Sequence, residues 1–357
     1  MKIPLEKLVV LYFGLGACAD NPKDKTTDTA SNNQTIKYGI CDMFVFEDMD
    51  SMYDPEQIEL YEQYIEVAKY LNIDTGRPHR PRGHVFSCNL VHPDINTWNF
   101  KDTDYFIELT QDAGITDILV TLYPEAGTDA KNESISVKLP DDLVLYRDCI
   151  TEIVERYDGD GSKDMGGLVN KVSAYEIGNE QFCDTDESRA EYLEIIKQTS
   201  TAVKEADDSV TFLPGGAAPL YNPYNINPSS TDSNAINIFS YLLKNNVQSS
   251  IDAVSFHYFV AEDPMDQVSI QTYFDEWRDV IGNDIPVWVT ETGFFPSEET
   301  TLTEQEVSKY KTWLQDHIAT IKANEAERVD FCRVREICAY ESQSLCDVYA
   351  DVLKENK

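Results

Sequence analysis

The amino-acid sequence predicts an α/β protein with a single (β/α)8 barrel (TIM barrel), and three observations lead to this fold. Short apolar runs with the character of strands alternate eight times with segments of helical apolar spacing. Such an alternation implies parallel strands joined by right-handed crossovers. The segment 117–124, "DILVTLYP", is a continuous apolar run, as expected for a strand that is covered on both faces.

The eight strands are predicted, in chain order, at 37–44, 72–77, 117–124, 172–180, 210–216, 251–259, 285–294 and 328–337. The helices that follow them are predicted at 54–71, 102–114, 140–157, 186–207, 234–246, 270–282, 303–323 and 345–356. The first helix has Ile58, Tyr61 and Ile65 on one side. The second begins at an Asp and ends at a Gly, and Pro140 suits the first turn of the third.

A doubly wound open sheet is the rival arrangement. Such sheets carry a glycine-rich phosphate-binding fingerprint after the first strand, and this chain has none there.

Of the 357 residues, 42% are hydrophobic and 11% aromatic, which is sufficient for a folded core. The net charge is −35, and because such a surface repels phosphate backbones, no nucleic-acid partner is expected.

Residues 1–17 have the pattern of an export signal, in which two lysines precede an apolar run that is too short to span a bilayer. The end of this segment, "LGAC", resembles the lipobox of bacterial lipoproteins. That resemblance implies cleavage before Cys18 and attachment of lipid to its sulfur. The alternative is an ordinary signal peptide with an incidental cysteine.

Residues 18–35 are polar and free of aromatic side chains, which suits a flexible tether. The folded catalytic domain is expected over 36–357. The expected location is therefore outside the cytoplasm, lipid-anchored at the cell surface or at the periplasmic face of a bacterial membrane. Among the seven cysteines after Cys18, the C-terminal three (Cys332, Cys338 and Cys346) are expected to include a disulfide pair, and buried thiols are the alternative for the others.

Two glutamates follow apolar strands at the same end of the predicted barrel. Glu180 follows the fourth strand in "YEIGNEQ", and Glu291 lies at the end of the seventh in "VWVTETG". Barrel active sites lie at the carboxyl ends of the strands. Hydrolysis of a glycosidic bond needs two carboxyl groups, one to protonate the leaving oxygen and one to attack or stabilise the anomeric carbon. The alternatives are a helix-start carboxylate for Glu180 and a surface turn for Glu291.

"EIGNE" and "TETG", in this order and on these strands, resemble the clan of retaining (β/α)8 glycoside hydrolases (clan A). The segment 76–124 is similar to the second and third strand units of its β-xylosidase-like and cellulase-like branches. The resemblance implies that Glu180 is the general acid/base and Glu291 the nucleophile. It also implies that Asn179 binds the sugar 2-hydroxyl and that the charge of Arg77 keeps the nucleophile ionised.

Members of this clan often carry a His and, two residues later, a Tyr on strand six. Here His257 is present, but Phe259 stands two residues on and Tyr258 is adjacent. Because a strand alternates its faces, His257 and Tyr258 cannot both point inward without a bulge. Both are kept as candidates for the sugar site, with a core histidine as the alternative.

The clan usually has a Trp at the end of strand eight as a floor for the sugar, and "VDFCRVREICAYES" has none. The candidates for stacking a sugar instead are Trp98, Tyr123, Phe294 and Phe295, with core packing as the alternative for each.

The segment 158–164, "DGDGSKD", has calcium-loop spacing but lacks the distal Glu of an EF-hand, so a turn is favoured. In "HRPRGH", His79 is assigned a sugar-site or structural role rather than a metal site.

Together these observations predict a retaining hydrolase of a β-linked poly- or oligosaccharide that requires no metal or organic cofactor. A second hypothesis is a non-catalytic carbohydrate-binding lipoprotein on a decayed barrel. The missing Trp and the displaced Tyr favour it, whereas the retention of Glu180, Glu291 and Asn179 opposes it. Transglycosylation would use the same residues with a different acceptor.

Overall fold

The computed structural model describes residues 36–41, 51–77, 85–124, 138–181, 183–217, 232–260, 269–294, 303–332, 334, 337–338 and 343–357. The chain divides into two units, 1–33 and 34–357, and every described residue belongs to the second. The predicted signal segment and tether lie outside the described residues, as do Cys18, His79 and Phe295. Within the described part of the chain, no helix is long and apolar enough to cross a bilayer.

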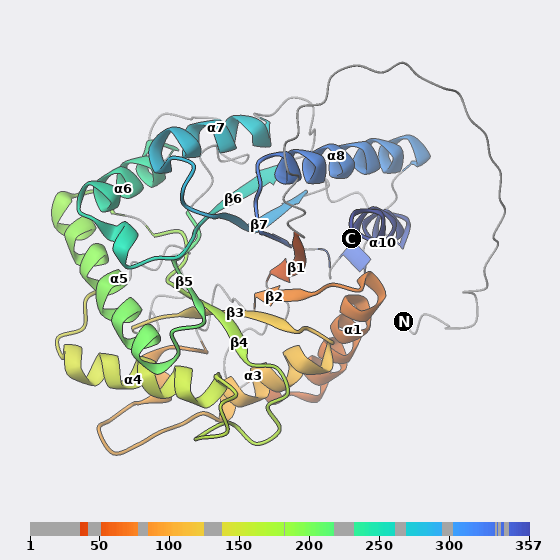
Figure 1. Ribbon diagram of the computed structural model, residues 1–357. Coiled ribbons are helices and arrows are strands. Elements are labelled where there is room, and N and C mark those ends of the chain that lie inside the picture. Colours follow the sequence, from red (N-terminus) through yellow and green to blue (C-terminus); the bar gives the residue numbers. More distant parts are fainter. Residues whose placement is uncertain are drawn as a thin grey trace. The chain divides into compact units, whose positions relative to one another are not determined.

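Eight parallel strands form one sheet in the second unit (Figure 1). They are β1 (Lys37–Cys41), β2 (Thr75–Arg77), β3 (Asp117–Leu122), β4 (Val172–Ile177), β5 (Thr211–Pro214), β6 (Val254–Val260), β7 (Val287–Phe294) and β8 (Arg328–Phe331). Their order in the sheet is β5-β4-β3-β2-β1-β8-β7-β6. The ends of this series meet just after β5, where the N–H of Ala217 donates to the carbonyl of Ser255 at 3.0 Å and the N–H of His257 donates to the carbonyl of Ala217 at 2.9 Å. These contacts join the two edges, and the predicted barrel is confirmed.

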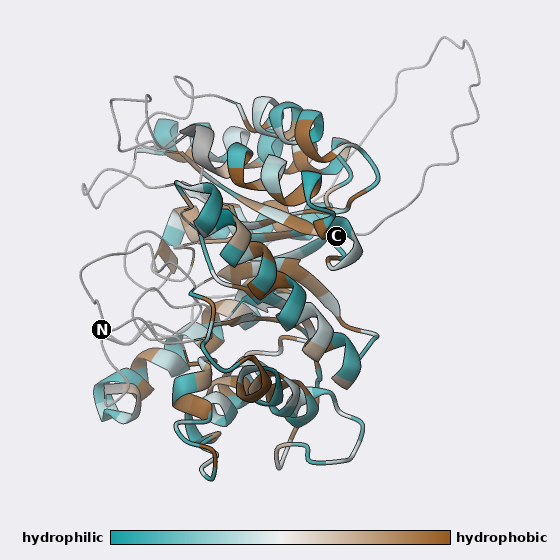
Figure 2. Cartoon of the chain, turned by 90° about the vertical axis from the view of Figure 1, so that its left-hand side faces the viewer, coloured by the Kyte–Doolittle hydropathy of each residue, from teal (hydrophilic) through white to brown (hydrophobic). Residues whose placement is uncertain are grey.

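Helices surround the barrel (Figure 1). They are α1 (Pro55–Leu71), α2 (Cys88–Val91), α3 (Lys101–Asp112), α4 (Leu143–Tyr157), α5 (Asp186–Ala206), α6 (Asp232–Lys244), α7 (Ile270–Ile281), α8 (Glu304–Ala323) and α10 (Gln343–Asn356), with short 3-10 turns η2 (Ser51–Tyr53) and η3 (Val247–Ser249). Figure 2 shows hydrophobic residues on the strands and a mixture of hydrophilic and hydrophobic residues along the outer helices. Side-chain caps begin several of these helices, and Thr185 and Thr303 each form a reciprocal capping box.

The predicted strand at 328–337 is too long. β8 ends at Phe331, and residues 337–338 are already helical. The N–H of Cys332 still donates to the carbonyl of Thr292 at 2.7 Å, after which the chain leaves the sheet. The apolar pattern could not show this boundary because residues on both sides of it are buried.

The inside of the barrel is built in layers. A small apolar cluster fills one level, formed by Leu119, Ala174, Leu213, Ala253 and Trp288. Because side chains alternate along a strand, the positions two residues further on, among them Thr121, Glu176 and Thr290, lie in the next interior level toward the carboxyl ends. The apolar cluster therefore separates this polar level from the amino end of the barrel.

β7 contains one extra residue relative to both of its neighbours. Against β6 the register shifts at Glu291, and against β8 it shifts between Val289 and Thr292. A shift of this kind is a β-bulge, which re-aims the side chains of the bulged strand. Strict alternation from Trp288 and Thr290 would turn Glu291 outward to the helices. The bulge lets Glu291 face the barrel interior.

Three disulfides link the described cysteines, Cys41–Cys332, Cys88–Cys149 and Cys338–Cys346, and Cys183 is a buried free thiol. The expected pair among the C-terminal cysteines is confirmed. Cys41, Cys88 and Cys149, for which the sequence left buried thiols as the alternative, are also paired. In the chain-entropy description a bridge across a separation of 291 residues, as for Cys41–Cys332, stabilises the fold by about 5.7 kcal/mol.

Gly39 in β1 should not tolerate a side chain. A Cβ atom there would lie 2.0 Å from the Asp330 carboxylate and 2.0 Å from the Thr75 hydroxyl. Asp330 cannot easily withdraw, since the Nε of Arg328 donates to it at 2.7 Å and both groups are buried. We expect Gly39→Ala to lower the free energy of unfolding by about 3 kcal/mol, measured by urea denaturation. Gly166→Ala is the matched control, because a Cβ at Gly166 would meet nothing within 4 Å; equal stabilities of the two variants would contradict the argument.

Candidate active site

Arg77 ends β2 and is fully buried at the centre of the polar level. Its Nε donates to Glu176 at 2.5 Å, its Nη1 to Glu291 at 2.6 Å and its Nη2 to the Oδ1 of Asn179 at 2.7 Å. The donors of a guanidinium are fixed in a planar fork. One side chain therefore sets the relative positions of groups from β4, from the segment after β4, and from β7. Removing one partner of such a buried ion pair typically costs 3–5 kcal/mol, roughly.

Glu291 presents its carboxylate at the bulge of β7. Its side chain is only 10% exposed. Besides the bond from Arg77, the Nε2 of His257 lies 3.6 Å from the same carboxylate oxygen. Glu291 is thus enclosed by a guanidinium and an imidazole, and the cationic partner favours its ionised form.

Glu180 follows β4 in an unusual backbone conformation. Its φ is 44°, in the left-handed region, and its N–H donates to the carbonyl of Gly216 at 2.9 Å. The positive φ of a residue other than glycine is uncommon and often marks functional sites. Its carboxylate lies 2.7 Å from the Nδ1 of His257, and 32% of its side chain is exposed. Glu180 is therefore the more accessible of the two predicted carboxylates.

Two glycines allow the strand ends to approach closely. A Cβ on Gly215 would lie 2.0 Å from the carbonyl oxygen of Gly178, and a Cβ on Gly216 would lie 2.1 Å from the Nε2 of His257. Any side chain at these positions would displace the segment that carries Glu180 or the imidazole itself. The two glycines directly after β5 are thus a packing requirement of the site.

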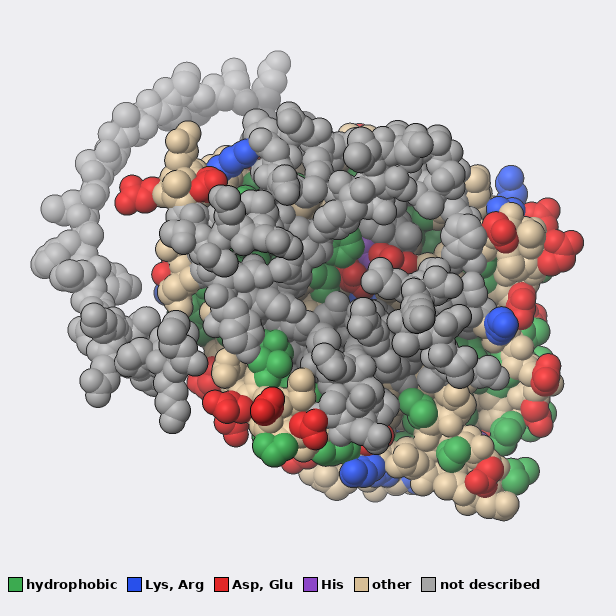
Figure 3. Space-filling model, turned by 180° about the vertical axis from the view of Figure 1, so that it is seen from behind, with side chains coloured by type: hydrophobic (Ala, Val, Ile, Leu, Met, Phe, Trp, Pro, Cys, Tyr) green, Lys and Arg blue, Asp and Glu red, His purple; other side chains and the backbone are tan. Residues whose placement is uncertain are grey.

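The two predicted carboxylates meet over the interior of the barrel. One oxygen of Glu180, one oxygen of Glu291 and one ring nitrogen of His257 lie within 4.8 Å of one another. Figure 3 shows acidic side chains and a histidine near the centre of one face of the molecule. The spacing would also suit metal ligands, but the guanidinium bound to Glu291 opposes a divalent cation there. The arrangement is that of two facing acids, one of which accepts a hydrogen bond from a buried guanidinium.

His257 is fully buried, and burial lowers its pKa to about 4 against an upward influence from Glu291. It is therefore neutral near pH 7. Alternation along β6 turns His257 inward and Tyr258 outward. The ring of Tyr258 lies 4.9 Å from that of Tyr273 on α7 and 5.4 Å from that of His317 on α8. The structure thus brings His257 to the two glutamates and Tyr258 to the helix layer.

The aromatic candidates lie in varied surroundings. Trp98 is half exposed and stacks on His92 and Phe100, with ring centroids 3.8 and 5.8 Å apart. Tyr123 is buried directly after β3, where its carbonyl accepts from the N–H of Cys88. Phe294 is the last residue of β7, and the structure describes its backbone only. Directly after β8 the chain has Cys332, which is bonded to Cys41.

Sequence reasoning missed Glu176 and Thr121. Glu176 is fully buried on β4, where it accepts from Arg77 and from the hydroxyl of Thr121, both at 2.5 Å. A charged residue inside the apolar run "VSAYEI" was the available signal, since a buried acid in a strand needs a cationic partner. Glu176 holds the side of Arg77 that faces away from Glu291.

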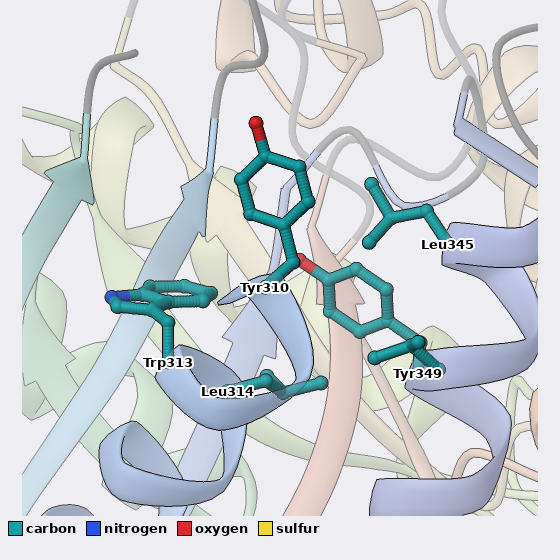
Figure 4. Close-up of a pocket in the computed structure, with 6 residues that line it drawn as sticks. Tyr310, Trp313, Leu314, Leu345 and Tyr349 are labelled. Carbon is teal, nitrogen blue, oxygen red and sulfur yellow. The ribbon is translucent and has the colours of Figure 1, made fainter. Parts of the chain in front are cut away.

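Two other features lie apart from these carboxylates. Carboxylate oxygens of Asp158, Asp160 and Asp164 lie within 4.8 Å of one another, in the turn between α4 and β4. Backbone N–H groups of the same turn donate to all three, as in the Asp- and Gly-rich turn favoured from the sequence. A shallow apolar depression lies between α8 and α10 (Figure 4), lined by Tyr310, Trp313, Leu314, Leu345, Val348 and Tyr349. None of the candidate site residues lines it.

No protein-family model matches the chain, and no curated protein matches it in sequence. Solved structures do share its fold. A glucosidase from Croceicoccus marinus aligns with a TM-score of 0.60 at 16% identity over 90% of this chain and 68% of its own. Xylanase 10B from Thermotoga maritima aligns with a TM-score of 0.57 at 13% identity over 90% and 96% of the two chains. The endo-beta-1,4-mannanase from Thermotoga petrophila aligns with a TM-score of 0.54 at 14% identity over 91% and 77%. At these identities the similarity establishes the barrel fold.

We expect mild acid to destabilise the protein through His257 and His317. Burial lowers the pKa of His257 to about 4 and that of His317 to about 3, from 6.5. Below pH 6.5 the unfolded chain binds protons that the folded chain does not bind until pH 4 or lower. The free energy of unfolding should therefore fall between pH 7 and pH 5, by about 2 kcal/mol for each histidine, in urea denaturation.

His317→Gln is the control for this pH dependence. The glutamine keeps a polar group near the hydroxyl of Thr292, which lies 2.9 Å from the Nε2 of His317, but it does not titrate. The loss of stability from pH 7 to pH 5 should be about 2 kcal/mol smaller in this variant. A pH dependence identical to that of the unmodified protein would show that His317 is not buried in the neutral form.

Proposed function

We propose that this protein is a retaining β-glycoside hydrolase that acts on a poly- or oligosaccharide. The observation that carries the proposal is the approach of Glu180 and Glu291, with one oxygen of each within 4.8 Å. Retaining glycosidases hold their two carboxyl groups about 5–5.5 Å apart, whereas inverting enzymes need about 6.5–9.5 Å to admit a water. The separation favours double displacement through a covalent glycosyl intermediate.

The surroundings of the two carboxylates support different roles. Glu291 is the proposed nucleophile, because Arg77 stabilises its anionic form and the bulge fixes its direction. Glu180 is the proposed acid/base, since it is more exposed and can protonate the leaving oxygen and later deprotonate water. The carboxylate charge of Glu291 close by favours the protonated form that Glu180 needs in the first step.

Two neighbours support the positions of these groups. The Nδ1 of His257 lies 2.7 Å from Glu180 and restrains its carboxylate. The Oδ1 of Asn179 accepts from Arg77, which leaves the amide NH2 to donate to a sugar hydroxyl. The proposed reaction needs only these side chains and water. Structures with the same barrel are named glucosidase, xylanase and mannanase, which agrees with a carbohydrate substrate.

Substitution of each glutamate should separate the two roles. Glu180→Gln should slow hydrolysis of phenyl β-glycosides by about 10²–10⁴-fold, because their leaving group needs a proton, but should affect 2,4-dinitrophenyl β-glycosides far less in the first step. Glu291→Gln should abolish hydrolysis of both, because no covalent intermediate can form. Initial rates measure both effects, and proton NMR should show the β-anomer as the first product.

The matched control for both variants is Glu187→Gln, an exposed glutamate in the first turn of α5. It should retain the rate of the unmodified protein. If Glu180→Gln slowed the hydrolysis of phenyl and 2,4-dinitrophenyl β-glycosides by the same factor, the proposed role of Glu180 as the acid would be contradicted. Binding of glycans without turnover by the unmodified protein would favour the non-catalytic hypothesis, which is supported by Cys332 in place of an aromatic residue at the end of β8.

We further propose that the protein is exported and anchored by lipid at Cys18. The support is the sequence pattern of residues 1–18, in which a short apolar run precedes "LGAC". Expressed in full in a bacterial host, the unmodified chain should sediment with membranes and incorporate labelled palmitate, and Cys18→Ala should do neither. Cys183→Ala is the control for general effects of cysteine removal. Equal palmitate incorporation by Cys18→Ala would exclude this anchor.

A further inference from the structure

The Cys41–Cys332 disulfide lies beside the carboxylate of Glu291. Cys41 ends β1 and Cys332 directly follows β8, so the bridge joins these neighbouring strands at the carboxyl end of the barrel. A sulfur of each cysteine and one oxygen of Glu291 lie within 4.8 Å of one another. Both cysteines are buried, with exposed fractions of 0% and 4%. The disulfide therefore forms part of the inner wall around Glu291.

Cys332 is also tied to the backbone that follows Glu291. Its N–H donates to the carbonyl of Thr292 at 2.7 Å. This bond lies where β7 returns to regular pairing with β8 after the bulge. Close contact continues at Gly293, where a Cβ would lie 3.0 Å from the carbonyl oxygen of Cys332. The position of Cys332 thus helps to define where the bulge ends.

The chemistry of the bridge differs from that of two thiols. A disulfide carries no charge and does not titrate, whereas a free thiol ionises with a pKa of about 8.5 and would then repel an adjacent carboxylate. With two separate thiols, the ends of β1 and β8 would be joined by backbone pairing alone, which extends to Ile40 and Phe331. The oxidised bridge therefore provides an uncharged and fixed wall beside Arg77, whose position on β2 pairs with Cys41 on β1.

We infer that Cys41 and Cys332, as a disulfide, are positioning residues for Glu291. The bridge fixes the end of the β7 bulge through the Cys332–Thr292 bond and keeps the Glu291 carboxylate against Arg77. This inference rests on the proposed function of Glu291 as nucleophile. It assigns to the bridge a kinetic effect, beyond its contribution to stability.

The test compares two double variants of equal chemistry. Cys41→Ala/Cys332→Ala removes this bridge, and Cys338→Ala/Cys346→Ala removes another near the same strand. At a temperature where circular dichroism shows both to be folded, kcat on an aryl β-glycoside should fall at least tenfold in the first variant, with KM within twofold. The second variant should keep both values. Because Glu291 would lose part of the charge of Arg77, the acid limb of kcat/KM should also move to higher pH in the first variant alone.

If the bridge contributed to stability alone, its removal would lower the melting temperature but would not shift the acid limb of kcat/KM. Unchanged kcat and an unchanged acid limb in the folded first variant would overturn the inference. Absence of turnover by the unmodified protein would instead contradict the proposed function, so the two failures are distinguishable.

Should the first variant not fold, the unmodified protein provides the same readouts after reduction by a dithiol. The reagent is oxidised to its cyclic disulfide, and Cys41 and Cys332 each take up a proton and an electron to become thiols. Mass spectrometry of alkylated thiols reports which bridges are open. We expect kcat to decrease in proportion to the fraction of Cys41–Cys332 that is reduced. A decrease in kcat that tracks only the reduction of Cys338–Cys346 would contradict the inference.

Discussion

The ion pairs of Arg77 are the interaction on which the rest of the site depends. A buried guanidinium is stable only if its donors are satisfied by acceptors, preferably charged ones. In this barrel Glu176, Asn179 and Glu291 supply them from two different strand units. The same bonds that satisfy the charge of Arg77 also fix the distance between the ends of β4 and β7. Stability and site geometry are therefore consequences of one network.

Two local departures from regular strand geometry set the directions of the Glu291 and Glu180 side chains, which the ion pairs of Arg77 alone do not determine. A regular β7 would turn Glu291 toward the helices, and the bulge allows it to face inward. On the opposite wall, the left-handed backbone of Glu180 directs its carboxylate over the barrel, where it meets His257. Such conformations cost energy, and the surrounding packing must hold them in place. The glycines at 215 and 216 permit that packing, since a Cβ at either would displace a neighbouring group.

The end of β8 shows how this barrel departs from the clan that its motifs resemble. Cys332, which directly follows β8, is buried and covalently joined to β1, and the sequence 328–341 has no Trp. The wall on this side is therefore covalently fixed. Among the aromatic candidates whose side chains the structure describes, Trp98 is half exposed.

The sequence by itself determined the alternation of eight strand–helix units and placed Glu180, Glu291, Asn179 and Arg77 at one end of the barrel. Those inferences follow from local periodicity and from the rule that parallel strands end at one edge. Only the tertiary structure decided the bulge in β7, the outward direction of Tyr258, the role of Glu176 and the pairing of Cys41 with Cys332. Each of these depends on register or contact between segments far apart in the chain. A shift of one residue reverses the face of every side chain that follows. A local pattern can therefore mark a buried acid such as Glu176, but it does not specify the partner or the register.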